Sequence, residues 1–141
     1  MSAHALLLTL KNDLTELARI AEEIESHGVS RRWPARWIMN LNLSLDELIT
    51  NTVSYGYQDT DEHEIRVMLT ERNGALVTVV EDDGVAFDPF TVAPTPDLEA
   101  DVEERPIGGL GVYFVKTLMD EVAYERVGDR NRITLVQRTP E

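Results

Sequence analysis

An Asn-Gly pair flanked by two strand-like segments is the feature that most constrains the fold of this chain. Residues 64–70 and 75–81 are rich in Val, Ile, Leu and Thr, and the Asn-Gly pair at 73–74 separates them. Both turn residues tolerate the positive φ angles of a tight hairpin, so the two segments are expected to pair as antiparallel strands. A second hairpin is expected near the C-terminus, where 123–127 and 132–137 flank the sequence GDRN.

Helical patterns occupy the N-terminal third and the region between the two hairpins. A short apolar segment at 5–10 is expected to be a strand, and apolar residues then recur at helical spacing over 14–28. Pro34 suits the first turn of a second helix that ends near Gly56, and a third helix is expected after Ile107. This order predicts an α+β fold, a two-layer sandwich with helices packed on one face of a mainly antiparallel (mixed) sheet.

The bulk composition is that of one folded domain, which is expected to span residues 1–141. The chain has 141 residues, of which 43% are hydrophobic and 28% charged, and a chain of this size can surround one core. Its formal charge of −13 disfavours contact with nucleic acid or with an anionic membrane. The acidity is interpreted first as a solubility feature, and a partner with a basic surface is the alternative.

The N-terminal sequence and the absence of cysteine indicate the cellular compartment in which the protein is expected. With no cysteine, the chain has no disulfide, cysteine-based zinc site or thiol nucleophile. The N-terminal apolar run lacks a basic segment before it, and no apolar stretch approaches the length of a membrane span. A cytoplasmic location is therefore expected.

The sequence LDELITNTVSYGY in the second helix carries the first candidate site. Glu47 and Asn51 are four residues apart, so their side chains project from the same face of that helix. Mg²⁺ prefers oxygen ligands and accepts few protein contacts when phosphates and waters complete its shell, so one Asn oxygen can suffice. Glu47 is a candidate proton acceptor. The alternative is that both residues face solvent on an amphipathic helix.

Two further candidate sites contain glycine. In VTVVEDDGVAFDPF, Asp82 is expected at a strand end, where its carboxylate can accept a hydrogen bond from the exocyclic amine of adenine, and Gly84 allows a close turn. The alternative there is a surface turn. In the segment from Ile107 to Gly111, IGGLG, backbone N–H groups at a helix start can bind phosphate. Neither a Rossmann nor a Walker-A pattern fits this segment.

The three segments, in this order, resemble the N-box, G1 box and G2 box of the GHKL superfamily. The short chain, the sequence DDGVAFDPF, the loop ending in EERPIGGLGVYFVKTLMDEV and the closing GDRNRITL resemble the anti-sigma-factor serine/threonine kinase family of the RsbW and SpoIIAB type. The resemblance covers almost the whole chain. One departure is Ala86, which stands where the G1 box usually has a second glycine.

The resemblance assigns roles to individual residues. It implies that Glu47 is the general base, that Asn51 binds Mg²⁺ and that Asp82 and Gly84 form the adenine site. It implies an ATP lid over about 88–107. The remaining implied nucleotide contacts lie at the end of the lid, at the start of the following helix and on the last strand: Arg105, Gly108, Gly109, Leu110, Gly111 and Thr134. For Arg105 the alternative is a solvated arginine with no phosphate contact.

The resemblance implies an ATP- and Mg²⁺-dependent serine/threonine kinase and anti-sigma factor. Its expected partners are a STAS-domain anti-sigma-factor antagonist, which it phosphorylates, and a sigma factor. The alternative is a nucleotide-dependent module that sequesters a partner without phosphotransfer. A homodimer is also expected by resemblance, whereas Trp33 and Trp37 fit either the core or a contact patch. None of His4, His27 and His63 lies in a motif, so no phosphoacceptor histidine is expected.

Overall fold

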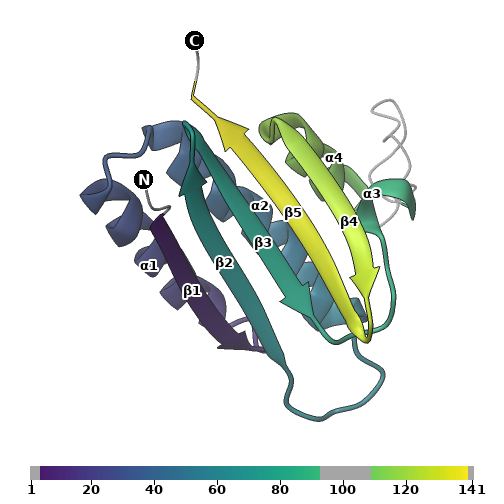
Figure 1. Cartoon of the computed structure of the whole chain (residues 1–141). Helices are drawn as coiled ribbons and strands as arrows, with labels where there is room; N and C mark the ends of the chain where they lie inside the picture. Colours follow the sequence, from purple (N-terminus) through teal and green to yellow (C-terminus); the bar gives the residue numbers. More distant parts are fainter. Residues whose placement is uncertain (1–3, 93–108, 140–141) are drawn as a thin grey trace.

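The computed structural model describes residues 4–92 and 109–139 and contains one five-stranded sheet. The strand order is β1-β2-β3-β5-β4, and every neighbouring pair is antiparallel (Figure 1). The α+β prediction is confirmed, and no parallel pair occurs among the described strands. In chain order the elements are β1 His4–Lys11, α1 Glu16–Ser30, α2 Ala35–Tyr55, β2 Glu64–Arg72, β3 Ala75–Asp82, α3 Pro89–Val92, α4 Gly109–Leu118, β4 Glu121–Val127 and β5 Arg130–Arg138.

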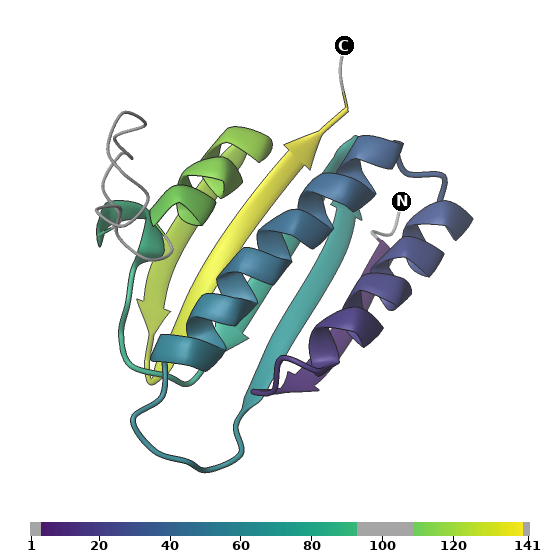
Figure 2. The ribbon, with the colours of Figure 1, turned by 180° about the vertical axis from the view of Figure 1, so that it is seen from behind.

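Three of the helices, α1, α2 and α4, cover a single face of the sheet. Figure 2 shows α2 lying between α1 and α4 on the viewer's side of the sheet, and α2 packs against both helices. The core between the two layers contains apolar side chains from the sheet and from the two long helices, including Ile24, Leu41, Leu48, Ile65, Val67 and Leu135. Trp33 and Trp37 are 7% and 4% exposed, so both belong to this core.

The two predicted hairpins are confirmed. Asn73 and Gly74 have φ angles of 51° and 76°, and they join β2 to β3. Gly128 has a φ of 61° in the turn between β4 and β5. These strands are longer than predicted because backbone pairing continues past the apolar residues that reveal a strand in the sequence.

Alternation along the strands separates a covered face from an open face. In β5, buried residues alternate with half-buried ones: Asn131, Ile133 and Leu135 are buried, and the residues between them are half-buried. Successive side chains of a strand point to opposite faces, so this pattern decides which polar residues can reach the helices. No helix in the described part of the chain is long and apolar enough to span a bilayer.

Candidate functional site

The first part of the site is the buried carboxylate of Asp82 at the end of β3. Asp82 is 4% exposed, and its Oδ1 accepts hydrogen bonds from the backbone N–H of Gly84 at 2.8 Å and from Nδ2 of Asn131 at 3.0 Å. Its other oxygen, Oδ2, has no hydrogen-bond partner among the described residues. The burial excludes the surface-turn alternative for Asp82. One carboxylate oxygen is held in place, and the other remains available as an acceptor.

Asn131 is the residue that organises the turn after β3. Its Nδ2 also donates to the carbonyl of Val85 at 2.8 Å. Its Oδ1 accepts from the hydroxyl of Tyr124 at 2.6 Å, from the N–H of Phe87 at 3.2 Å and from Nη1 of Arg126 at 3.2 Å. Because every polar atom of this buried amide has a partner, the turn carrying Asp82 is held in one conformation.

Gly84 is required by a close backbone approach to the end of α2. A Cβ at this position would lie 2.5 Å from the carbonyl oxygen of Gly56, the residue that caps α2. The next residue, Val85, donates its N–H to the same oxygen at 2.8 Å. A side chain at position 84 would therefore push the Asp82 turn away from α2. The absence of a side chain at Gly84 thus lets the turn that carries Asp82 pack against the end of α2, the helix that carries Glu47 and Asn51.

The second part of the site is the Glu47 and Asn51 pair on α2. Nδ2 of Asn51 donates to Oε1 of Glu47 at 3.4 Å, and both residues are half-buried. On the same helix Asn42 points toward α1 and donates to the carbonyl of Ala21. At about 100° per residue, Glu47 lies about 140° around the helix from Asn42. Glu47 therefore lies on the side of α2 that is turned away from α1.

The environment of Glu47 suits a proton acceptor. Partial burial raises the pKa of this carboxyl above its ordinary value, the hydrogen bond from Asn51 lowers the pKa, and the charge of Asp46 raises it. The net direction is upward, which brings the carboxylate closer to the proton affinity that general-base catalysis requires. The solvent-facing alternative for this pair is thus replaced by a partly buried pair with a direct contact.

The glycine-rich sequence opens a helix, as predicted. Helix α4 begins at Gly109, so Leu110 and Gly111 lie in its first turn. At the other end of the expected lid, α3 begins at Pro89 and was not predicted because four residues give no helical period. Its Phe90 packs against the core. Arg105, Gly108 and residues 93–107 of the lid lie outside the described residues.

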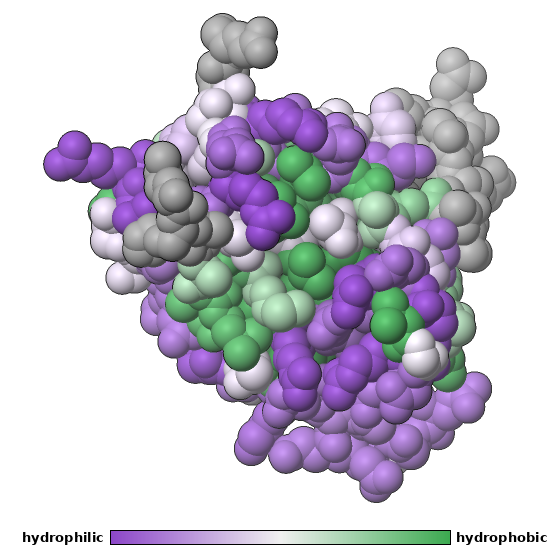
Figure 3. Space-filling model, in the orientation of Figure 1, coloured by the Kyte–Doolittle hydropathy of each residue, from purple (hydrophilic) through white to green (hydrophobic). Residues whose placement is uncertain are grey.

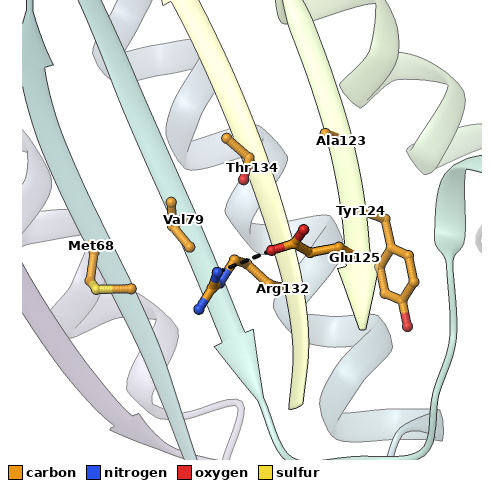
Figure 4. Close-up of a pocket in the computed structure, with 7 residues that line it drawn as sticks. All are labelled: Met68, Val79, Ala123, Tyr124, Glu125, Arg132 and Thr134. Atoms are coloured by element: carbon orange, nitrogen blue, oxygen red, sulfur yellow. Dashed lines mark hydrogen bonds and ion pairs between the residues drawn. The ribbon is translucent and has the colours of Figure 1, made fainter. Parts of the chain in front are cut away.

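The structure corrects the prediction for Thr134. Thr134 pairs with Val79, and Figure 4 shows both on the open face, around a hollow of about 380 Å³. Asp82 is three residues beyond Val79, so its side chain faces the other side of the sheet. The residue on the last strand that supports Asp82 is Asn131 instead. The open face carries an apolar area at its centre, with exposed Leu7 on β1 and Val79 among its residues (Figure 3).

Two residues at this site were missed by sequence reasoning. Asn131 could have been found from the alternation of β5, where Asn131, Ile133 and Leu135 share the buried face. His63 lies in the loop after α2, and its Nδ1 is 3.0 Å from Oδ1 of Asp83, next to Asp82. No pattern in the sequence indicates this contact, because the two residues are brought together by the pairing of β2 with β3.

A metal at this site would need ligands from outside the protein. Within residues 4–92 and 109–139, no group of three or more His, Cys, Asp or Glu side chains is placed to hold a metal ion. Asn51 donates through Nδ2, which leaves its Oδ1 as a hard oxygen ligand beside the carboxylate of Glu47. This set fits an ion such as Mg²⁺ that arrives with phosphate and water ligands.

Comparison with known proteins yields one family and a set of similar kinases. Residues 10–137 match the family described as histidine kinase-like ATPase domain. The chain is 28% identical over 116 residues to the serine/threonine-protein kinase BtrW of Bordetella bronchiseptica, covering 82% of this chain and 81% of BtrW. It is 35% identical over 89 residues to the serine-protein kinase RsbW of Listeria monocytogenes, covering 60% of this chain and 56% of that protein.

A solved structure shares the fold. A crystal structure of the RsbU and RsbW domains of a Mycobacterium tuberculosis protein superposes with a TM-score of 0.64 at 15% identity. The match covers 96% of this chain and 32% of that one. At this identity the likeness supports the fold alone. Its coverage indicates that the whole described sheet and its helices belong to the shared architecture.

Proposed function

The chain belongs to the histidine kinase-like ATPase domain family, and from this premise we propose that it binds ATP and transfers the γ-phosphate to a serine or threonine of a partner protein. The names of BtrW and RsbW support a protein kinase. Because the chain spans about half the length of the Listeria RsbW, this activity is a proposal for the present chain. The observation that carries the proposal is the buried Asp82, with one oxygen fixed and one available.

The adenine base is assigned to the Asp82 turn. The free Oδ2 of Asp82 accepts a hydrogen bond from the exocyclic amine of adenine, a group that guanine does not present at that position. Gly84 lies beside it, and its missing side chain permits the tight packing against Gly56. We assign the phosphates to the start of α4 at Gly109, where backbone N–H groups and the helix dipole favour anions. Arg105 and Gly108 remain proposed contacts within a lid over about 88–107.

Asn51 and Glu47 are assigned to the reacting end of ATP. Asn51 would hold Mg²⁺ through Oδ1, and the bound ion supplies neutralisation of phosphate charge. Glu47 accepts the proton of the attacking hydroxyl as that oxygen forms a bond to the γ-phosphorus. The bond from this phosphorus to the bridging oxygen breaks, and ADP leaves. Positioning and charge neutralisation provide most of the rate in such transfers.

The partner and the assembly follow from the resemblance of the chain to anti-sigma-factor kinases. We propose that the acceptor is a STAS-domain anti-sigma-factor antagonist, that phosphorylation weakens its binding, and that the unphosphorylated antagonist releases a sigma factor from this protein. A cytoplasmic location and a homodimer belong to the same proposal. Sedimentation equilibrium of the full chain tests the dimer, because the mass it measures separates one copy from two.

The kinase is tested by the intact mass of a STAS-domain partner after incubation with this protein, ATP and Mg²⁺. The expected result is the gain of one phosphate with the wild type and with Asp46→Asn, which changes the exposed neighbouring carboxylate of the same helix. Glu47→Gln should slow the gain by about 10² to 10⁴-fold, the usual contribution of a general base, while ATP binding persists.

The same experiment separates the alternative function. If the partner gains no phosphate but still forms an ATP-dependent complex, the protein is a nucleotide-dependent binding module for that partner. If Glu47→Gln transfers phosphate as fast as the wild type, Glu47 is not the base. If neither ATP binding nor a complex is detected, the nucleotide site itself is wrong.

A further inference from the structure

His63 lies between two carboxylates beside the proposed nucleotide site. Its Nε2 is 2.7 Å from Oδ1 of Asp59, in the same loop, and its Nδ1 is 3.0 Å from Oδ1 of Asp83, in the turn after β3. The side chain of His63 is 16% exposed, against 50% for Asp59 and 37% for Asp83. The imidazole is therefore the least exposed member of a three-residue bridge between two segments of the chain.

The geometry of this bridge requires the charged form of the ring. An ionised carboxylate only accepts hydrogen bonds, and a neutral imidazole has one N–H donor and one lone pair. With a neutral ring, one of the two contacts would place a lone pair against a carboxylate oxygen. With both nitrogens protonated, each donates to one carboxylate, so the imidazolium satisfies both contacts at once.

The bridge reaches Asp82 by two routes. Asp83 follows Asp82 directly in the chain, and Val85 in the same turn is bonded to Gly56 at the start of the His63 loop. The ring of Tyr57 stacks on His63, with centroids 4.1 Å apart and planes at 14°. Burial raises the pKa of the Tyr57 phenol, and the charges of Asp82 and Asp83 raise it further.

We propose that His63, as an imidazolium bridging Asp59 and Asp83, is a positioning residue that holds the Asp82 turn in its nucleotide-binding conformation and makes ATP affinity depend on pH. This inference rests on the proposed ATP site. His63 does not touch the nucleotide in this proposal. It acts through Asp83 and the turn that contains Asp82.

The direction of the pH dependence follows from the charges around the ring. The charged groups that face it are Asp59 and Asp83, Tyr57 covers one ring face, and Asn12 bonds the backbone of His63 from the β1–α1 loop. The hydrogen bond to Asp59 is the largest cause that raises the pKa of His63 above its ordinary 6.5, and both carboxylate charges add to it. The bridge is thus fully formed below the ordinary pKa and is lost as pH rises through the raised one.

ATP affinity measured by calorimetry with saturating Mg²⁺, from about pH 6.5 to about pH 9.5, tests this inference. Three forms are compared: the wild type, His63→Gln, which is neutral at every pH, and His63→Arg, whose planar cation can bridge the two carboxylates and stack on Tyr57 without titrating. His27→Gln, in the last turn of α1, is the matched histidine control. Dividing each affinity by that of His63→Arg removes the ionisation of ATP itself.

The expected result is a wild-type affinity that matches His63→Arg at low pH and falls about threefold to tenfold toward His63→Gln at high pH. His27→Gln should follow the wild type. Equal pH profiles for the wild type and His63→Gln, with ATP bound tightly by both, would overturn the role of His63 and leave the ATP site intact. If the wild type bound no ATP at any pH, that result would contradict both the proposed ATP site and this inference.

A second measurement tests the bridge without ATP. The imidazole resonances of His63 in the free protein should titrate above the ordinary value of 6.5, and Asp59→Asn should bring the midpoint down. A midpoint at or below the ordinary value would show that the ring does not hold its charge between the two carboxylates, and it would contradict the inference even if ATP binds.

Discussion

The two polar clusters of the proposed site are built in different ways. Glu47 and Asn51 lie one helical turn apart on α2, are half-buried and share a single 3.4 Å hydrogen bond. Asp82 and Asn131 are each 4% exposed, and they lie on the neighbouring strands β3 and β5, 49 residues apart in the chain. Each polar atom of Asn131 is bonded, across several segments. The first cluster joins residues close in sequence through one hydrogen bond, whereas the second joins residues far apart in sequence through several hydrogen bonds.

This difference suits the Glu47 cluster to proton transfer and the Asp82 cluster to stabilising the fold. A loosely bonded carboxylate with a raised pKa can exchange a proton at little cost to the fold. A buried, fully bonded amide cannot change without leaving several polar groups unpaired. We therefore expect substitutions on α2 to alter turnover and substitutions around Asp82 to alter stability and binding.

The largest effect is expected for Asn131→Ala. It removes donors from Asp82 and Val85 and the acceptor of Tyr124 and Arg126, so the free energy of unfolding should fall by about 2–4 kcal/mol. Urea denaturation followed by circular dichroism measures it. Glu47→Gln, measured alongside, should change this free energy by no more than about 0.5 kcal/mol. Equal losses in the two variants would contradict the contrast between the clusters.

Asp82→Asn is expected to weaken ATP binding by about 30- to 100-fold. The amide can keep an oxygen toward the N–H of Gly84 and Nδ2 of Asn131, but it then presents a donor where adenine also offers one. Hydrogen bonds to charged groups contribute about 1.5–3 kcal/mol. Calorimetry measures the affinity, with Asp129→Asn in the exposed turn between β4 and β5 as the control. An unchanged affinity would remove Asp82 from the adenine site.

A smaller effect is expected in the pH dependence of phosphotransfer. Because burial raises the pKa of Glu47 and the base must be ionised, the rate should fall as pH falls through that raised value, by about tenfold per pH unit below it. Asp46→Asn removes a charge that raises the pKa of Glu47, so it should move this limb of the profile to lower pH. A limb that stays in place in Asp46→Asn, or that persists in Glu47→Gln, would assign the titration to another group.

The smallest effect is expected for Thr134→Val. The side chain of Thr134 lies on the open face of the sheet, whereas that of Asp82 lies on the face covered by helices. Because Val also favours strands, the substitution should leave ATP affinity within about twofold of the wild type. The same titration that measures Asp82→Asn provides the comparison. A loss of tenfold or more would mean that the last strand presents the other face to the nucleotide.

The sequence predicted the helices and the hairpins well because their signals are local. Pro34 and Gly56 mark the ends of α2, and the Asn-Gly pair marks the first hairpin. Position on a strand face was predicted less well. The resemblance implies a nucleotide contact at Thr134, but Thr134 and Asn131 are three residues apart on β5, so their side chains lie on opposite faces of the sheet.

The sequence by itself determined the order of the elements other than the short α3, and it determined the family. It also determined the pairing of Glu47 with Asn51, because helical geometry places residues four apart together whatever surrounds them. Only the tertiary structure decided that Asn131 supports Asp82, that Gly84 packs on Gly56 and that His63 joins Asp59 to Asp83. Two of these contacts join residues brought together by strand register, and Gly84 meets Gly56 where α2 ends against the turn after β3. The other contact of His63, to Asp59, depends on the path of a loop. None of these arrangements has a repeat that can be recognised along the chain.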